Sequence, residues 1–244
     1  MRYTLVKLDT TDSTNDYLRH YTPAEGEEMT VAVSRYQTAG RGQGGNKWES
    51  EAGKNLLFSI LTHPVNVPAR RQFVLSMAAA LALRDVLAAF TSGITLKWPN
   101  DVYWNDLKIS GTLIETRLSG ESITACITGT GVNVNQRVFR SNAPNPVSLA
   151  NITGKETDID RLLADIMCAF CVYYDKACRH EYAYISDCYH AALYRRTGVY
   201  EYEDVHGLFA AETVGVDESG RLLLRRADDG KVKAYGFKEV RFVL

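Results

Sequence analysis

Apolar and polar residues alternate near the start of the chain and recur at helical spacing further along, which predicts both strands and helices. Alternation at 3–8 indicates a β-strand. Short apolar runs between turn residues predict further strands at 30–36, 55–61, 94–98, 108–115 and 123–128. A long helix is expected to begin at Pro68, because apolar residues follow at helical spacing at Phe73, Val74, Met77, Leu81 and Leu87. A second amphipathic helix is expected after Asp158, which can cap it.

Two later stretches of the chain differ from this pattern. Residues 140–157 are expected to form a loop. From 198 onward, short alternating segments are separated by turn signals such as His206-Gly207 and Asp229-Gly230. Turn signals at this spacing predict a small β-barrel. We therefore expect two domains, at 1–197 and 198–244.

Composition excludes several classes of protein. The 244 residues are 45% hydrophobic and 23% charged, which is ordinary for a globular chain. A net charge of -1 gives no overall attraction to nucleic acid or to an anionic membrane, so phosphate chemistry would need a local cluster of cations. The chain begins without an apolar signal core, and its five cysteines, an odd number, favour reduced thiols in a cytoplasm.

Cys168 and Cys171 form a CxxC pair ahead of Cys178, His180, Cys188 and His190, a set that could in principle bind a metal. A single CxxC inside an amphipathic helix is weak evidence for metal binding. We expect core packing for these thiols and no structural metal.

The most distinctive stretch is QTAGRGQGGNKWE at 37–49. Its glycines let the backbone approach a ligand closely, while Arg41 and Lys47 supply positive charge and Trp48 supplies a large flat ring. That combination suits an anion bound beside something flat. A solvated surface loop has the same composition, so this stretch alone does not decide between the two.

Two other segments offer polar groups. Asp12-Ser13-Thr14-Asn15 precedes a short helix, where the Ser13 hydroxyl either caps the helix or contacts a small polar ligand. In KWPND at 97–101, Pro99 restricts Trp98 to an extended conformation. This fixes the directions in which the side chains of Lys97, Asn100 and Asp101 point. Lys108 follows a turn, where a lysine is normally a solvated charge.

Four motifs then occur in a fixed order: DSTN at 12–15, QTAGRGQGGNKW at 37–48, KWPND with KISGTLIE at 97–115, and GTGVNVN at 129–135. Together they resemble the biotin protein ligases, over nearly the whole chain. The resemblance implies an α+β fold of the class II synthetase type, with a central mixed or antiparallel sheet, helices on one side and a C-terminal SH3-like β-domain. It also implies a two-step reaction, in which biotin and MgATP give biotinyl-5'-AMP and a lysine of a biotin carboxyl carrier protein then takes the biotin.

The resemblance assigns residues to each part of this reaction. Arg41 and Lys108 are the catalytic candidates, because cations must neutralise the charge that develops when a carboxylate attacks a phosphate. Lys97 and Lys47 are expected to support them. The biotin-binding candidates are Ser13, Thr14, Asn15, Gln37, Gly40, Arg41, Gly42, Gln43, Trp48, Lys108 and Gly111. The nucleotide-binding candidates are Lys97, Asn100, Asp101, Gly129, Gly131 and Asn133, with Mg²⁺ accompanying the ATP and no metal held by the protein alone. The glycine-rich loop at 40–47 is expected to close over the adenylate, which water would otherwise destroy.

The chain also departs from the family pattern. Many members read GRGR where this chain reads GRGQ, so Gln43 replaces a cation. DSTN begins at residue 12, which leaves no room for the helix-turn-helix domain of some members, and no DNA binding is expected.

Two alternatives stay open. The first is a lipoate or octanoate ligase, although the RRxSGGG and His-Asp pattern of those enzymes is not seen. The second is a non-catalytic ligand-binding module with the same fold. The sequence does not reveal the oligomeric state.

Overall fold

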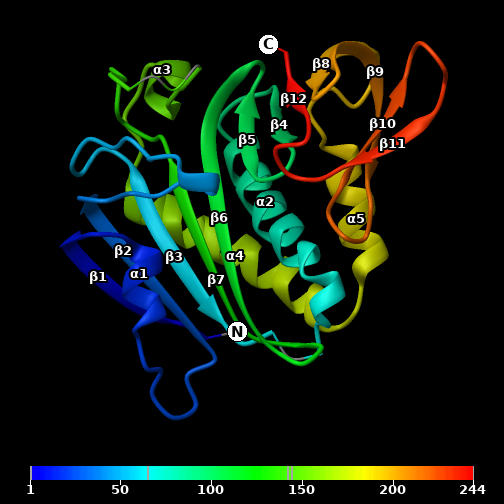
Figure 1. Cartoon of the computed structure of the whole chain (residues 1–244). Coiled ribbons are helices and arrows are strands. Elements are labelled where there is room, and N and C mark those ends of the chain that lie inside the picture. The colour runs from blue at the N-terminus through cyan, green and yellow to red at the C-terminus, as the bar shows by residue number, and fades with distance from the viewer. Residues whose placement is uncertain (1, 65, 142, 144, 244) are drawn as a thin grey trace.

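A seven-stranded mixed sheet organises the larger part of the molecule. The computed structural model describes residues 2–64, 66–141, 143 and 145–243. The strands are β1 (Thr4–Thr11), β2 (Met29–Gln37), β3 (Leu56–Thr62), β4 (Ile94–Lys97), β5 (Asp101–Trp104), β6 (Leu107–Ser119) and β7 (Ser122–Val132). Their order across the sheet is β1-β2-β3-β7-β6-β5-β4 (Figure 1). Only β1 and β2 pair in parallel, so the predicted mixed sheet is confirmed.

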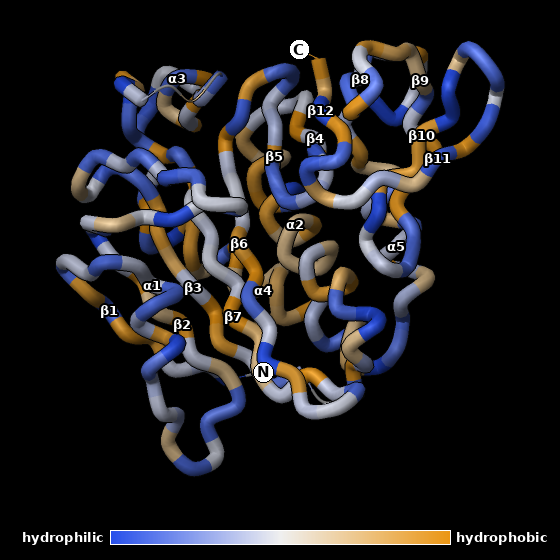
Figure 2. Tube along the Cα trace, in the orientation of Figure 1, coloured by the Kyte–Doolittle hydropathy of each residue, from blue (hydrophilic) through white to orange (hydrophobic). Residues whose placement is uncertain are grey.

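Two long helices cover one face of this sheet. They are α2 (Phe73–Ala88) and α4 (Ile159–Cys178), followed by α5 (Tyr182–Ala191) (Figure 1). The large core lies between these helices and the sheet, where β3 contributes Leu56, Phe58 and Ile60. Figure 2 shows apolar stretches of the chain along these strands and helices. The helix predicted from Pro68 begins later, because Ala69–Arg71 forms a separate 3-10 turn before α2.

A short helix, α1 (Thr14–Arg19), lies on the opposite face of the sheet. Its Leu18 packs in a small cluster with Ala32, Leu61, Ala125 and Ile127. Side chains alternate between the two faces of a strand, so Leu57, Ser59 and Leu61 of β3 point to the α1 side. All of β3 is buried, because both faces of the sheet are covered here.

The segment 140–157 is not entirely a loop, and this part of the prediction is wrong. It contains α3 (Leu149–Thr153), which begins with a capping box between Ser148 and Asn151. The helix ends at Gly154, which adopts a left-handed conformation that glycine tolerates without strain. Both signals were present in the sequence, but five helical residues are too few to produce a periodic pattern.

The C-terminal strands form a second, five-stranded antiparallel sheet in the order β11-β10-β9-β8-β12. Their bounds are β8 (Val199–Asp204), β9 (Gly207–Val216), β10 (Leu222–Arg226), β11 (Val232–Tyr235) and β12 (Arg241–Phe242). This sheet lies beside α5 (Figure 1). The turns predicted at His206-Gly207 and Asp229-Gly230 connect these strands. Gly207 and Gly230 both have positive φ, a conformation that tight turns often require.

Among the residues that the structure describes, there is neither a metal-binding cluster nor a helix that could span a membrane. All five cysteines are unpaired thiols, and Cys168 is exposed, so it does not pack in the core as expected. No group of three or more histidine, cysteine or acidic side chains is arranged to hold a metal within the described part of the chain. None of the described helices combines the length and apolar character that a membrane span requires.

Candidate functional site

A cavity of about 520 Å³ lies over the sheet face that α1 occupies. Its walls come from α1, the glycine-rich loop, the strands β6 and β7, and the C-terminal segment. Most of the residues predicted from sequence line it together. They are Ser13, Thr14, Asn15, Gln37, Arg41, Gly42, Gln43, Trp48, Lys97, Asn100, Asp101, Lys108, Gly111, Gly129 and Gly131.

The floor of the cavity is a patch of sheet without side chains. Gly111 pairs with Gly131, and Gly129 pairs with both Leu113 and Ser59. Paired residues of antiparallel strands project to the same face, so the three glycines form one depression. A Cβ at Gly129 would lie 1.8 Å from Oδ1 of Asn15, and a Cβ at Gly131 would lie 2.4 Å from the Trp48 indole. These glycines therefore make room for other side chains of the protein itself, as well as bordering the cavity.

Trp48 lies across this floor. Its ring is close enough to Gly131 and Gly111 that neither could carry a methyl group without displacement, and Lys108 Nζ lies 5.7 Å from the ring centre. The indole Nε1 is buried, and no hydrogen-bond acceptor for it is found among the described residues. Oε1 of Gln43, on the same loop, is likewise buried and unpartnered within the described chain. Unpartnered buried polar groups are costly, so both atoms indicate a place that a ligand or a loop movement completes.

A hydroxyl and amide cluster forms the wall at α1. Oε1 of Gln37 accepts hydrogen bonds from the Thr14 amide at 2.7 Å and the Thr14 hydroxyl at 3.0 Å. The Ser59 hydroxyl lies 2.6 Å from both Thr14 Oγ1 and Asn15 Oδ1. With its oxygen engaged, Gln37 keeps its NH₂ group as a donor for other partners. This wall therefore presents donors in fixed positions.

Ser13 occupies the N-cap position of α1, but its side chain makes no capping hydrogen bond. The residue is buried and lines the cavity. Of the two interpretations that the sequence left open, side-chain capping is not observed, and contact with a ligand stays a prediction.

The glycine-rich loop folds back on itself. Arg41 and Lys47 form a β-bridge, and the Gly42 amide donates to the Asn46 carbonyl at 2.6 Å. The turn at its tip is possible because Gly44 and Gly45 have φ of 67° and 89°. The Lys238 ammonium from the C-terminal segment donates to the Gly44 carbonyl at 3.1 Å. This contact joins the C-terminal segment to the tip of the loop.

Lys108 enters the cavity because of an irregularity in β6. Val102 pairs with Ser110 but the next residue, Tyr103, pairs with Lys108, which leaves Ile109 as an extra residue. Ile109 packs in the large core, and the bulge turns Lys108 to the other face of the sheet. Its Nζ lies 2.7 Å from Oδ1 of Asp101, so the lysine is held by an ion pair and is not simply solvated.

Lys97 is a partly buried cation of the cavity wall. Its Nζ donates to the Tyr103 hydroxyl at 3.0 Å and lies 5.0 Å from the centre of the Phe242 ring. Burial lowers the pKa of Lys97 to about 8, while Asp101 raises it and the positive charge of Lys108 lowers it further. The ammonium is therefore mostly protonated at neutral pH and loses its charge in mildly alkaline solution.

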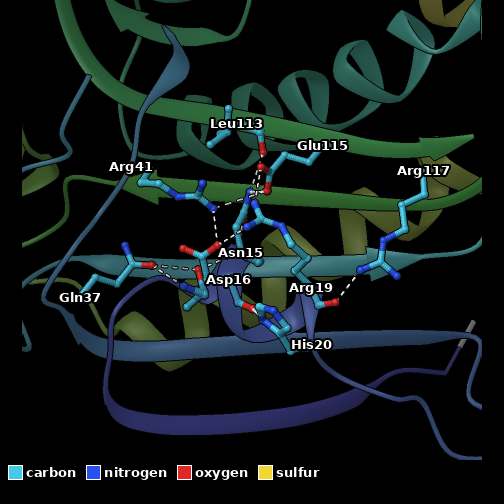
Figure 3. A network of polar contacts seen from close by, with 11 residues as sticks. Asn15, Asp16, Arg19, His20, Gln37, Arg41, Leu113, Glu115 and Arg117 are labelled. Atoms are coloured by element: carbon cyan, nitrogen blue, oxygen red, sulfur yellow. Dashed lines mark hydrogen bonds and ion pairs between the residues drawn. The ribbon is translucent and has the colours of Figure 1, made fainter. Parts of the chain in front are cut away.

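Arg41 is held at the edge of the cavity by carboxylates. Its Nη2 lies 2.8 Å from Oδ1 of Asp16 and 3.8 Å from Oε2 of Glu115 (Figure 3). Arg19 bridges the same two carboxylates. Neither acidic residue was singled out in the sequence.

Two predicted site residues do not line the cavity. Asn133 is buried beneath it, where Nδ2 donates to the Val147 carbonyl at 3.2 Å and Oδ1 has no partner among the described residues, so its assignment to the nucleotide stays a prediction. Gly40 allows the backbone of Trp48 to pass, because a Cβ at Gly40 would lie 3.0 Å from the Trp48 carbonyl oxygen.

Several residues of the site were missed by sequence reasoning. The polar Ser59 in the apolar run of β3 was a usable signal, because buried strands rarely contain an unsupported hydroxyl. The C-terminal residues gave no signal, since only the fold brings them to the cavity. The missed lining residues include Thr112, Thr130, Phe237, Lys238, Arg241 and Phe242.

The cavity is strongly cationic. One carboxylate, Asp101, lines it within the described part of the chain, against six cationic side chains. These cations are Arg41, Lys47, Lys97, Lys108, Lys238 and Arg241. A chain with a net charge of -1 has thus gathered positive charge at one place, which suits a ligand with several negative charges.

Comparison with known proteins gives consistent relatives. Residues 8–133 match the model of the biotin/lipoate A/B protein ligase family. A biotin–[acetyl-CoA-carboxylase] ligase of Paracoccus denitrificans is 33% identical, over 89% of this chain and 92% of the relative. The bifunctional ligase/repressor BirA of Bacillus spizizenii is 28% identical, over 95% of this chain and 72% of the relative. Among solved structures, a biotin protein ligase from Aquifex aeolicus in complex with biotin and ATP superimposes with a TM-score of 0.80 and 27% identity, over 98% of this chain and 99% of that one.

The glycine floor predicts the effect of a single methyl group. Gly131→Ala should displace Trp48 and lower the free energy of unfolding by about 1–3 kcal/mol, as overpacking of an interior does. Urea denaturation followed by tryptophan fluorescence measures this. Gly236→Ala is the matched control, because its Cβ would meet only the end of the flexible Glu239 side chain. Equal stability of the two variants would contradict the position of Trp48.

The burial of Lys97 predicts a pH-dependent stability. Its pKa is about 8 in the folded protein and 10.5 in an exposed lysine, so between these values the unfolded chain binds more protons. The free energy of unfolding should therefore rise with pH in this window, relative to Lys97→Gln, which cannot titrate. Denaturant titrations of both proteins at pH 7.5 and pH 9.5 test this. Parallel pH profiles for the two proteins would show that Lys97 does not titrate as described.

Proposed function

The chain belongs to the biotin/lipoate A/B protein ligase family as a biotin protein ligase, and we propose that it works in two steps in the cavity described above. In the first, the carboxylate of biotin is joined to the α-phosphate of ATP. In the second, the biotinyl group passes to a lysine of a carrier protein. The observation that supports this most strongly is the meeting of a hydroxyl and amide wall with six cations in a single cavity.

The first step needs positive charge at a defined place. An oxygen of the biotin carboxylate forms a bond to the α-phosphorus, the bond to the β-phosphate oxygen breaks, and pyrophosphate leaves with the electrons. Attacking and leaving groups are both anionic, so fixed cations lower the barrier. One cation about 4 Å from an anion contributes roughly 4 kcal/mol at an effective dielectric near 20. Arg41 and Lys108 are proposed for this role, with Lys97 and Lys47 in support.

The biotin ring is proposed to bind at the α1 wall. A ureido group has a carbonyl acceptor and two N–H donors, and the wall offers the Ser13 hydroxyl, the Thr14 hydroxyl and the Gln37 NH₂ group. Trp48 supplies an apolar surface beside them for the ring or the acyl chain. A polar end and an apolar surface in one pocket match the two halves of the ligand.

ATP is proposed to bind with Mg²⁺, and the residues present fit that mode. Mg²⁺ usually keeps several waters and takes one or two carboxylates together with substrate phosphates. Asp101 is the carboxylate that lines the cavity among the described residues, and Asn100 lies next to it. The ion would neutralise charge on the phosphates. Lys108 pairs with the same carboxylate, so Asp101 also keeps a catalytic cation in place.

The second step requires the loop to open. The lysine amine of the carrier attacks the acyl carbon, the amide bond forms, and AMP leaves. Because water would hydrolyse the same intermediate, we expect residues 40–47 to close over it and to open toward the carrier. The contact from Lys238 to Gly44 supports a role for the C-terminal segment in that movement. A carboxylase domain is the proposed carrier, and the unpaired cysteines support a cytoplasmic location.

Biotin-dependent exchange of labelled pyrophosphate into ATP tests the first step. We expect exchange with biotin and none with lipoate. Lys108→Ala should lower the rate about 100- to 1000-fold, the usual effect of removing one transition-state charge contact. Lys231→Ala is the control, because that lysine is exposed in the connection between β10 and β11 and pairs only with Asp229 among the described residues.

Two results of this assay would contradict the proposal. Exchange with lipoate in place of biotin would make the protein a lipoate-type ligase. Absence of exchange with either acid, in a protein that is folded, would make it a binding module.

Gln43 predicts weak retention of the intermediate. A neutral amide holds phosphate less strongly than a guanidinium does, so Gln43→Arg should slow dissociation of biotinyl-5'-AMP about 10-fold. Stopped-flow displacement of the adenylate measures that rate, with Asn46→Arg, which also lines the cavity, as the charge-matched control. An unchanged dissociation rate for Gln43→Arg, or an equal effect of Asn46→Arg, would show that position 43 has no special role.

A further inference from the structure

Two carboxylates and two guanidinium groups form a closed network beside the cavity (Figure 3). Oδ1 of Asp16 lies 2.8 Å from Arg41 Nη2 and 2.5 Å from Arg19 Nη1. Oε1 of Glu115 lies 2.6 Å from Arg19 Nη2. The charges cancel within the network, and each carboxylate has at least one strong, charge-assisted hydrogen bond.

Only one nitrogen of Arg41 takes part in this network. Nη2 contacts Asp16 and, at 3.8 Å, Glu115. For Nε and Nη1 no acceptor is found among the residues that the structure describes. A guanidinium has five N–H donors in a rigid plane, so fixing one edge determines the direction of the others. Arg41 lines the cavity while it is held in this way, and its remaining donors are available there.

Asp16 is itself firmly supported. It lies in the first turn of α1, and Arg19, three residues later on the same helix, connects it to Glu115 of β6. Glu115 also accepts a hydrogen bond at 2.9 Å from Asn15, whose side chain occupies the space above Gly129. The carboxylate that holds Arg41 is thus tied to the helix and to the sheet.

The loop that carries Arg41 pairs its backbone with Lys47 but provides no partner for the guanidinium among the described residues. Arg41 stands between Gly40 and Gly42, and a long side chain on a glycine-rich loop has many conformations to lose before it can act. A catalytic group must be held in its productive geometry, because small displacements reduce the rate strongly. The rigid support for Arg41 must therefore come from outside its own segment.

We infer that Asp16 is a positioning residue for Arg41: it holds one edge of the guanidinium so that the other donors point at the reacting carboxylate and phosphate. This inference rests on the proposed function and on the role proposed there for Arg41. It assigns to Asp16 an effect on the rate of adenylation, without contact between Asp16 and either substrate.

The test uses three variants of the full chain in the biotin-dependent pyrophosphate exchange assay. Asp16→Ala removes the acceptor and should lower kcat about 10-fold with little change in KM for biotin, because orientation and not binding is lost. Asp16→Asn keeps an acceptor oxygen and should recover most of that loss. Asp165→Ala removes a comparable aspartate–arginine pair on α4, far from the cavity, and should behave as the wild type. Thermal denaturation of each variant separates misfolding from a change in rate.

A double-mutant cycle shows whether the effect acts through Arg41. In an Arg41→Ala background, the change Asp16→Ala should cause no further loss. An equal additional loss in that background would overturn the inference, as would a wild-type kcat for Asp16→Ala. A lower KM for ATP together with an undiminished kcat would also overturn it, because Asp16 would then restrain Arg41 from binding anions. If the wild-type protein itself shows no exchange, the proposed function fails first and independently.

Discussion

The structure depends on a small area of sheet that carries no side chains. Gly111 of β6 and Gly129 and Gly131 of β7 lie in register on adjacent strands. Because glycine has no side chain, the sheet leaves a depression there, where other residues would project side chains. Asn15 and Trp48 enter that hollow from two different segments. The polar wall, the aromatic surface and the cationic rim are all positioned relative to this floor. A methyl group at Gly129 or Gly131 would collide with one of them.

Around this floor, carboxylates hold the two catalytic candidates, Arg41 and Lys108, in place. Asp16 and Glu115 lie behind Arg41, whereas Asp101 lines the cavity and pairs with Lys108. Each pair reduces the cost of placing several positive charges close together before an anionic substrate arrives. Burial lowers the pKa of Lys97, and the nearby Asp101 carboxylate offsets only part of this effect. The site is therefore preorganised for negative charge, and its electrostatics depend on residues from α1, β5 and β6.

Much of this could be predicted from the sequence, for identifiable reasons. Most of the strands, α2 and α4 follow from apolar periodicity, although β5 was not predicted, and the motifs predicted Arg41, Lys108, Gln37 and Trp48 as neighbours. The bulge that turns Lys108 into the cavity could not be predicted, because it depends on one residue of register between β5 and β6. Lys238 and Phe242 belong to the site only through the placement of the second sheet. Ser13 could not be assigned from the sequence, because its position suggested helix capping. In the structure its hydroxyl makes no capping hydrogen bond, and the residue lines the cavity.

The central claim is that this cavity joins biotin to the α-phosphate of ATP. A single-turnover experiment tests it most directly, with enzyme in excess over ATP labelled at the α-phosphate, biotin present, and the reaction quenched and separated on a time scale of seconds. We predict that the label moves into biotinyl-5'-AMP in step with pyrophosphate release. Label that stays in ATP, or that appears only as free AMP or ADP from the earliest time points, would contradict the account.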